Sequence, residues 1–188
     1  MARLEAAARH AAYSARFAAL IDGVADWAAP TPVKEWTARD VVAHLIDWFP
    51  GFLAMGSDVA LPAGPPVADD PAGAWRARAS AVQAILDDPA TDQRVFRSRM
   101  FDDLPLADAI DQFYTVDIFM HSWDLARSSG QHDTLDDATC AELLAGMAAM
   151  AAVIRSSGQF GDQQPVAADA PPKDQLLAFI GRDPHWRP

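Results

Sequence analysis

Apolar residues recur along most of the chain at intervals of three and four, which is the spacing of one face of an α-helix. This periodicity predicts helices over residues 4–24, 41–49, 71–88, 106–129, 135–157 and 173–180. Thr37 and Asp40 have the spacing of a capping box, so the second helix is expected to open there. Strand signals are almost absent, apart from an irregular stretch at 91–105 that is expected to form a short extended or hairpin segment. The pattern predicts an all-α fold in which four to six antiparallel helices pack as a bundle.

Two stretches rich in proline and aspartate, residues 56–71 and 159–172, interrupt the helical periodicity. We interpret both as loops, and for the first we exclude a domain linker because too little independent core lies on either side of it. A chain of 188 residues can bury roughly 70% of its unfolded surface in one core without disulfides or a structural metal. The sequence therefore predicts a single domain over residues 1–188.

The charge balance, the lengths of the apolar runs and the cysteine content indicate which partners and which cellular compartment to expect. The chain has 26 acidic residues against 15 lysines and arginines, whereas nucleic-acid binding draws on clustered basic residues. No apolar run approaches the roughly 20 residues that a membrane span needs. The single cysteine, Cys140, lies in an apolar helical run and is expected to be buried, in a reducing compartment. We therefore expect a cytoplasmic protein whose partners are small molecules or proteins, with no nucleic acid and no membrane.

Arg94, Arg97 and Arg99 form the densest basic cluster of this acidic chain. We interpret the cluster as a solvated face of the protein. The alternative, which the sequence leaves open, is a seat for an anionic substrate.

The helix predicted over residues 106–129 carries the most informative pattern. Its apolar stripe consists of Leu106, Ile110, Phe113, Asp117, His121 and Leu125. Asp117 and His121 interrupt this stripe, and because they are four residues apart they lie on the same face of the helix. An unpaired buried carboxylate is costly. Three interpretations therefore compete: a hydrogen-bonded pair in the core, two ligands of a metal site, or a general-base pair.

His44 lies at the edge of the apolar arc of the helix that opens at Thr37. Taken alone, it is interpreted as a histidine at a helix interface. Helix bundles build their sites from inward side chains of facing helices, and His44 with Asp117 and His121 would supply two imidazoles and one carboxylate. That is the ligand set of a catalytic zinc or similar divalent site with open positions. Separate core histidines are the alternative, because sequence spacing does not give the distance between two helices.

Three runs of the chain, residues 36–45, residues 121–127 with Gly130, and residues 177–184, resemble the DinB-like metal-binding proteins. The resemblance covers nearly the whole chain and is closer to the branch that includes the N-terminal domain of mycothiol-dependent maleylpyruvate isomerase. It implies a DinB-like antiparallel four-helix bundle with an additional short C-terminal helix. It also implies a divalent metal, zinc or nickel, held by His44, Asp117 and His121. That branch usually has Glu where this chain has Asp117, which is one methylene shorter.

The resembling runs contain three further candidate residues. Asp124 is expected to accept a hydrogen bond from the metal-binding part of its helix, or to anchor a neighbouring helix, without binding the metal itself. Trp123 and Arg182 are candidate substrate-binding residues. The alternatives are that Trp123 only packs and that Arg182 only docks the C-terminus.

The relatives that the resemblance implies couple a low-molecular-weight thiol to an electrophile. A divalent metal with an open position lowers the pKa of a bound thiol, so no cysteine nucleophile from the protein is expected. The implied function is a metal-dependent, mycothiol-type thiol transferase, or a thiol-dependent isomerase, that acts on small electrophiles, and a homodimer is expected. Maleylpyruvate is not carried over as the substrate, because the isomerase has a further C-terminal domain. A metal-binding bundle for sensing or storage, and a bundle that works through protein contacts, are the alternatives.

Overall fold

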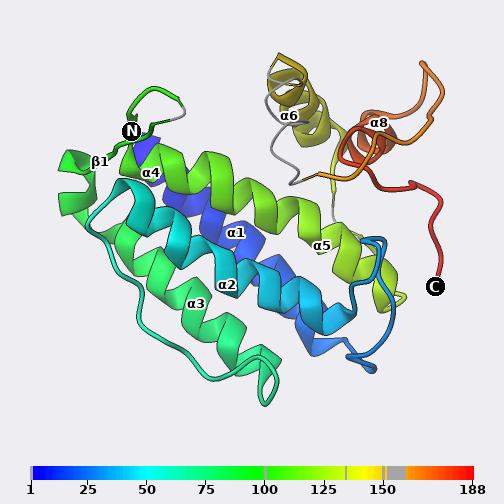
Figure 1. Cartoon of the computed structure of the whole chain (residues 1–188), viewed down its shortest axis with the longest axis horizontal. Coiled ribbons are helices and arrows are strands. Elements are labelled where there is room, and N and C mark those ends of the chain that lie inside the picture. Colours follow the sequence, from blue (N-terminus) through cyan, green and yellow to red (C-terminus); the bar gives the residue numbers. More distant parts are fainter. Residues whose placement is uncertain (1, 100, 134, 150, 152–159) are drawn as a thin grey trace.

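The computed structural model describes residues 2–99, 101–133, 135–149, 151 and 160–188, and its fold is all-α (Figure 1). Four long helical segments form a DinB-like bundle, which confirms the predicted fold class. These segments are α1 (Ala2–Asp22), α2 (Ala38–Gly56), α3 (Pro71–Asp87), and a fourth that joins α4 (Leu106–Ala109), the π-helical turn η2 (Ile110–Thr115) and α5 (Val116–Ser128).

Capping residues set the points where α2 and α3 begin. The Thr37 hydroxyl oxygen accepts a hydrogen bond from the Asp40 amide, and an Asp40 carboxylate oxygen accepts one from the Thr37 amide at 2.8 Å. This reciprocal pair is the predicted capping box. At α3, the Asp70 carboxylate accepts a hydrogen bond from the Gly73 amide at 2.7 Å, and Pro71 occupies the first turn, where its missing N–H costs nothing.

The helices are arranged so that α2 and α5 face each other in opposite directions (Figure 1). α1 likewise runs antiparallel to α3. Residues 57–70 form a loop between α2 and α3, where a loop was predicted. This loop carries the chain back along the bundle, so α2 and α3 run in the same direction. The antiparallel pair α2 and α5 brings together segments about seventy residues apart in sequence, and this pair holds the candidate site.

Apolar side chains from all four segments meet in one core. Its largest fully buried members are Phe17, Leu45, Phe49, Leu53, Trp75, Leu86, Phe96, Leu106, Ile110, Tyr114 and Ile118. Burying each such side chain contributes about 1.5–3 kcal/mol. The core therefore fixes the spacing of α2 and α5 without help from a ligand.

The fourth segment differs from the regular helix that its periodicity predicts, because η2 is a π-helical turn placed directly before α5. A π-turn inserts one extra residue into an α-helix and is frequently found at functional sites. It rotates the preceding side chains about the helix axis. Within this turn Tyr114 is fully buried, whereas Phe113, which the predicted stripe places inward, is half-buried.

The predicted hairpin is present as a short two-stranded sheet. β1 (Val95–Phe96) pairs antiparallel with β2 (Leu104–Pro105), after the short 3-10 helix η1 (Pro89–Gln93). Arg94 lies 3.9 Å from Asp88 and Arg97 lies 3.5 Å from Asp103, both as ion pairs at the surface. These pairs favour the interpretation of the arginine cluster as a solvated face.

The C-terminal part of the chain packs against one side of α5. α6 (Asp137–Ala149) and α8 (Pro172–Phe179) contact each other, and their apolar side chains form a second cluster with Phe119, Met120 and Trp123 of α5. Cys140 is fully buried in this cluster, as predicted. The predicted end of the helix at residue 157 lies outside the described residues. Within the described parts of the chain, no helix is both long enough and apolar enough to cross a membrane.

Candidate metal centre

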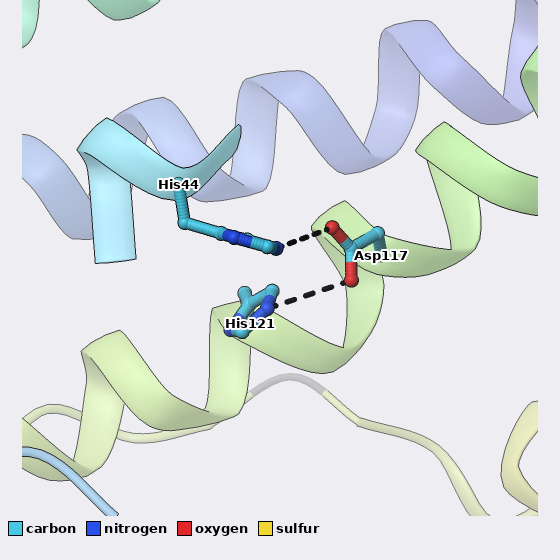
Figure 2. Close-up of side chains that lie close together, drawn as sticks. All are labelled: His44, Asp117 and His121. Carbon is cyan, nitrogen blue, oxygen red and sulfur yellow. Dashed lines mark hydrogen bonds and ion pairs between the residues drawn. The ribbon is translucent and has the colours of Figure 1, made fainter. Parts of the chain in front are cut away.

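The structure brings His44 of α2 together with Asp117 and His121 of α5 (Figure 2). The Nε2 atom of His44 lies 3.2 Å from one carboxylate oxygen of Asp117, and the Nε2 atom of His121 lies 3.5 Å from the other. One ligand atom from each residue lies within 4.8 Å of the other two. The distance between the two helices, which the sequence could not give, is therefore short enough for one site.

Asp124 fixes the orientation of His121. The Nδ1 atom of His121 lies 2.9 Å from an Asp124 carboxylate oxygen. An ionised carboxylate only accepts hydrogen bonds, so Nδ1 is the ring nitrogen that carries the proton. The lone pair of Nε2 is thereby directed toward Asp117, which is the arrangement that metal-binding histidines commonly have.

The atoms facing each other across the cluster fit a cation. The Nε2 atom of His121 lies 3.5 Å from a carboxylate oxygen of Asp117, and in the neutral ring these are two acceptors, which repel unless a proton or a metal ion lies between them. A tetrahedral ion with ligands at 2.0–2.1 Å places them roughly 3.3 Å apart. Since all three ligand atoms already lie within 4.8 Å of one another, modest side-chain movement would close them on an ion. Two imidazoles and a carboxylate are the donors that zinc and nickel accept.

Asp117 is held in its ionised form by its neighbours. Burial opposes ionisation of this side chain, but His121, together with hydrogen bonds from His44 and Trp48, outweighs burial and lowers the pKa of the carboxyl below its usual value. The Trp48 indole N–H donates to the same oxygen that faces His44, at 3.0 Å. The Asp117 side chain is shorter than that of Glu, but its two oxygens still lie within 3.5 Å of the Nε2 atoms of His44 and His121. The shorter side chain therefore keeps the carboxylate next to both histidines.

Asp124 is itself buried and paired. Its side chain is 1% exposed, and the Arg182 guanidinium donates to both of its oxygens, from Nε at 3.2 Å and from Nη2 at 2.9 Å. Burial opposes ionisation, but Arg182 and His121 outweigh it and lower the pKa of the Asp124 carboxyl. Asp124 thus contacts His121 and is not part of the His44, Asp117 and His121 cluster.

The two predicted substrate-binding residues lie inside the protein. Trp123 is 1% exposed within the second apolar cluster, with the Arg127 guanidinium 5.5 Å from its ring centroid. Arg182 is 8% exposed and bonded to Asp124 and to the Ile180 carbonyl oxygen. Both residues therefore have packing or pairing roles in this structure, and contact with a substrate stays a prediction.

Two tryptophans next to the cluster were not identified from the sequence. The Trp36 ring lies 5.0 Å from the His44 ring and is stacked on the His121 ring at 5.7 Å between centroids. Trp48 follows His44 by four residues on α2, so its helical spacing was a usable signal. Trp36 precedes α2 in a loop, where no periodicity indicates the direction of a side chain.

The helical bundle and its His–Asp–His cluster define a DinB-like protein. Residues 7–126 match the family model described as the mycothiol maleylpyruvate isomerase N-terminal domain. The chain belongs to this family, which is part of the DinB-like superfamily.

Similar curated proteins come from Mycobacterium tuberculosis. The uncharacterized proteins MT0763 of strain CDC 1551 and Rv0738 of strain H37Rv are each 35% identical to this chain over 175 residues, which cover 88% of this chain and 91% of the relative. No solved structure matches the chain significantly. The family is therefore established, whereas the relatives supply no activity.

Proposed function

We propose that this protein binds one divalent metal ion, zinc or nickel, through His44, Asp117 and His121, and uses it to transfer a low-molecular-weight thiol to a small electrophile. The observation that carries the proposal is the convergence of two Nε2 atoms and a carboxylate within 4.8 Å. The mycothiol-related family supports a thiol as the cosubstrate.

The residues around the cluster have distinct tasks in this proposal. Asp124 holds His121 by its Nδ1 atom, and Trp48 holds Asp117 by one oxygen. Trp36 covers the ring of His121, whose side chain is 7% exposed, whereas the His44 side chain is 30% exposed. A small molecule would therefore approach from the His44 side, while Asp124, whose side chain is 1% exposed, is shielded from water.

The nucleophile in this proposal is the small-molecule thiol and not the protein. Burial, with a smaller contribution from Asp136 and Asp137, raises the pKa of the Cys140 thiol to about 12, so it is not ionised near neutral pH. A divalent ion supplies positive charge that favours the thiolate of a bound cosubstrate. The S–H bond of the thiol breaks and its proton leaves to solvent. A new S–C bond forms, and the leaving group departs with the electron pair of its former bond to carbon.

A metal-binding protein without turnover is the second candidate, and one observation favours it. Two surface hollows in the described part of the chain, of about 480 and about 580 Å³, are lined by other residues: one by the C-terminal end of α5 and the last residues of the chain, the other by the end of α2 and β1. The cluster residues line neither of them. Sensing or storage needs no substrate cavity, so activity measurements have to decide between the two candidates.

The first experiment measures metal binding by the chain purified without an affinity tag. We expect about one divalent ion per chain by elemental analysis after incubation with zinc or nickel. His121→Ala should lose the ion, while His132→Ala, which removes an exposed histidine elsewhere, should keep it. Wild-type protein without bound metal, or equal retention in both variants, would contradict the proposed site.

The second experiment measures turnover with the metal-loaded protein. Mycothiol is the thiol, and a chloronitrobenzene, which loses chloride when the S–C bond forms, is the electrophile. We expect saturable consumption of the electrophile that requires both the thiol and His121. Tight metal binding without such consumption would establish the non-catalytic candidate instead. The predicted homodimer is checked on the same preparation by light scattering.

A further inference from the structure

A continuous chain of polar contacts links the C-terminal end of the protein to the cluster. It runs from the Nδ1 atom of His121 to Asp124 at 2.9 Å, and from Asp124 to the Arg182 guanidinium at 2.9 and 3.2 Å. Arg182 lies outside residues 7–126, which match the family domain. We infer that Arg182 is a positioning residue of the metal centre, acting on His121 through Asp124. The inference rests on the proposed metal site.

All three nitrogens of the Arg182 guanidinium donate a hydrogen bond here. Its Nε and Nη2 atoms donate to the two oxygens of Asp124, and its Nη1 atom donates to the Ile180 carbonyl oxygen at 3.0 Å. A planar fork of this kind orients a carboxylate in a way that a single ammonium group does not. The oxygen of Asp124 that binds His121 is therefore fixed both in distance and in direction.

Without Arg182, the environment of Asp124 would change in a defined way. The carboxylate is 1% exposed, and a buried charge of this kind needs a partner. His121 would be the remaining side-chain partner, and the carboxylate could rotate about its own bond. The ring of His121 would then lose the constraint that directs its Nε2 lone pair toward Asp117.

The backbone after α8 is built to bring Arg182 to this place. The Arg182 amide donates to the Leu177 carbonyl oxygen at 2.8 Å, and the Gly181 amide donates to the Ala178 carbonyl oxygen at 3.1 Å. These two bonds form a Schellman motif, which requires the left-handed conformation at Gly181, where φ is +86°. A Cβ atom at Gly181 would also lie 2.7 Å from the backbone of Gly161. Glycine is therefore required both by the turn and by the close approach.

A purely structural role for Arg182 is the competing explanation, since the residue also docks the C-terminal segment on α5. The ion pair between Lys173 and Asp133 offers a matched control. Lys173 is in the first turn of α8 and lies 3.3 Å from Asp133, in the segment after α5. Lys173→Met removes a charged contact of the same segment without touching Asp124 or His121.

The experiment compares wild type, Arg182→Met, Arg182→Lys and Lys173→Met, each confirmed as folded by circular dichroism. Zinc affinity is measured by competition with a chelator, and the protonation of each His121 ring nitrogen is measured by nitrogen-15 NMR on metal-free protein. We expect a loss of zinc affinity of about 10–100-fold in Arg182→Met. We expect a smaller loss in Arg182→Lys and no change in Lys173→Met.

In the NMR measurement, we expect wild type to carry the proton on Nδ1 of His121, and Arg182→Met to shift both ring-nitrogen signals. Unchanged zinc affinity and unchanged signals in Arg182→Met would overturn the inference. If wild type binds no zinc, the proposed function fails, but the NMR comparison still decides whether Arg182 orients His121.

The two glycines supply a second test that leaves Arg182 in place. Gly181→Ala forces a side chain into the left-handed turn and against Gly161, whereas a Cβ added at Gly161 has its nearest contact at 3.5 Å. We expect Gly181→Ala to weaken zinc binding in the same direction as Arg182→Met, and Gly161→Ala to leave it unchanged. Equal affinities in the two alanine variants would contradict the role of the turn.

Discussion

Two histidines, His10 on α1 and His121 on α5, are both buried in the bundle, but they have different partners. His10 is fully buried, with its Nδ1 atom 2.7 Å from the Gln83 side-chain oxygen and its Nε2 atom 3.2 Å from the Ser14 hydroxyl. A neutral imidazole satisfies this pair, since one nitrogen donates to the amide oxygen and the other accepts from the hydroxyl. His10 therefore has complete hydrogen bonding as an uncharged residue.

His121 has a carboxylate on each side, Asp124 at 2.9 Å and Asp117 at 3.5 Å. A neutral imidazole can donate to only one of them, so both contacts are satisfied only with a second proton on the ring or with a metal ion at its other nitrogen. The comparison shows that two buried histidines of one bundle differ in the charge and hydrogen-bonding capacity of their partners.

The largest expected effect separates the two histidines directly. His121→Ala should lower zinc affinity by more than about 100-fold, because it removes a ligand and not only a supporting contact. His10→Gln should leave zinc affinity unchanged, because its partners belong to α1 and α3 and not to the cluster. Competition titrations against a chelator measure both. A comparable loss in the two variants would mean that general loosening of the bundle, and not ligation, controls metal binding.

A second expected effect concerns the carboxylate that the cluster shares. Asp117→Asn keeps the size of the side chain but removes its charge, and zinc affinity should fall on the order of 100-fold. Trp48→Phe keeps the charge and removes only the indole donor at 3.0 Å, so its loss should be no more than about tenfold. The same titration compares the two. Full zinc affinity in Asp117→Asn would show that the negative charge of Asp117 does not contribute to metal binding.

A third effect concerns the helix that carries His44. Thr37→Ala removes one half of the capping box and should lower the free energy of unfolding by about 1 kcal/mol. The His10–Gln83 contact lies on other helices, so the His10 ring signals in NMR should not move. Urea unfolding measures the stability change, and Thr37→Ser, which keeps a hydroxyl, is the control. Equal stability of the alanine and serine variants would show that the cap does not hold α2.

The smallest effect concerns the pH dependence of stability. Burial lowers the pKa of His10 below its ordinary value of 6.5, although the Gln83 contact opposes the shift. The unfolded chain therefore binds more protons at this residue than the folded chain. The contribution of neutral His10 to the free energy of unfolding is therefore complete above about pH 6.5. It is lost as the pH falls below that value toward the lower pKa of His10 in the folded state.

His10→Gln does not titrate and should not show this loss. Urea unfolding at about pH 7.5 and about pH 5.5 should give a larger fall in the free energy of unfolding for wild type than for the variant. Parallel curves for the two proteins would contradict a neutral buried His10.

The sequence predicted those parts of the structure that depend on local pattern. The helical periodicity, the capping box at Thr37 and the placement of Pro71 each depend on residues within one turn of each other. The i, i+4 spacing likewise placed Asp117 and His121 on one face, and the three-residue spacing gave Asp124 its contact with His121. Local spacing is sufficient where the contact is made within a helix.

Contacts between distant segments could not be predicted in the same way. No residue pattern indicates the π-turn η2, in which Tyr114 is fully buried and Phe113 only half-buried. Trp36 covers the cluster from a loop. Arg182 is 58 residues from Asp124, and only the three-dimensional fold shows that the two side chains pair.

The measurement that tests the central claim most directly is anomalous diffraction at the zinc edge from crystals soaked in zinc. The account predicts one peak about 2.0–2.2 Å from the Nε2 atoms of His44 and His121 and from an Asp117 oxygen. A map without a peak there, in which His44, Asp117 and His121 remain bonded only to one another, would show that the cluster is a hydrogen-bonded core and not a metal centre.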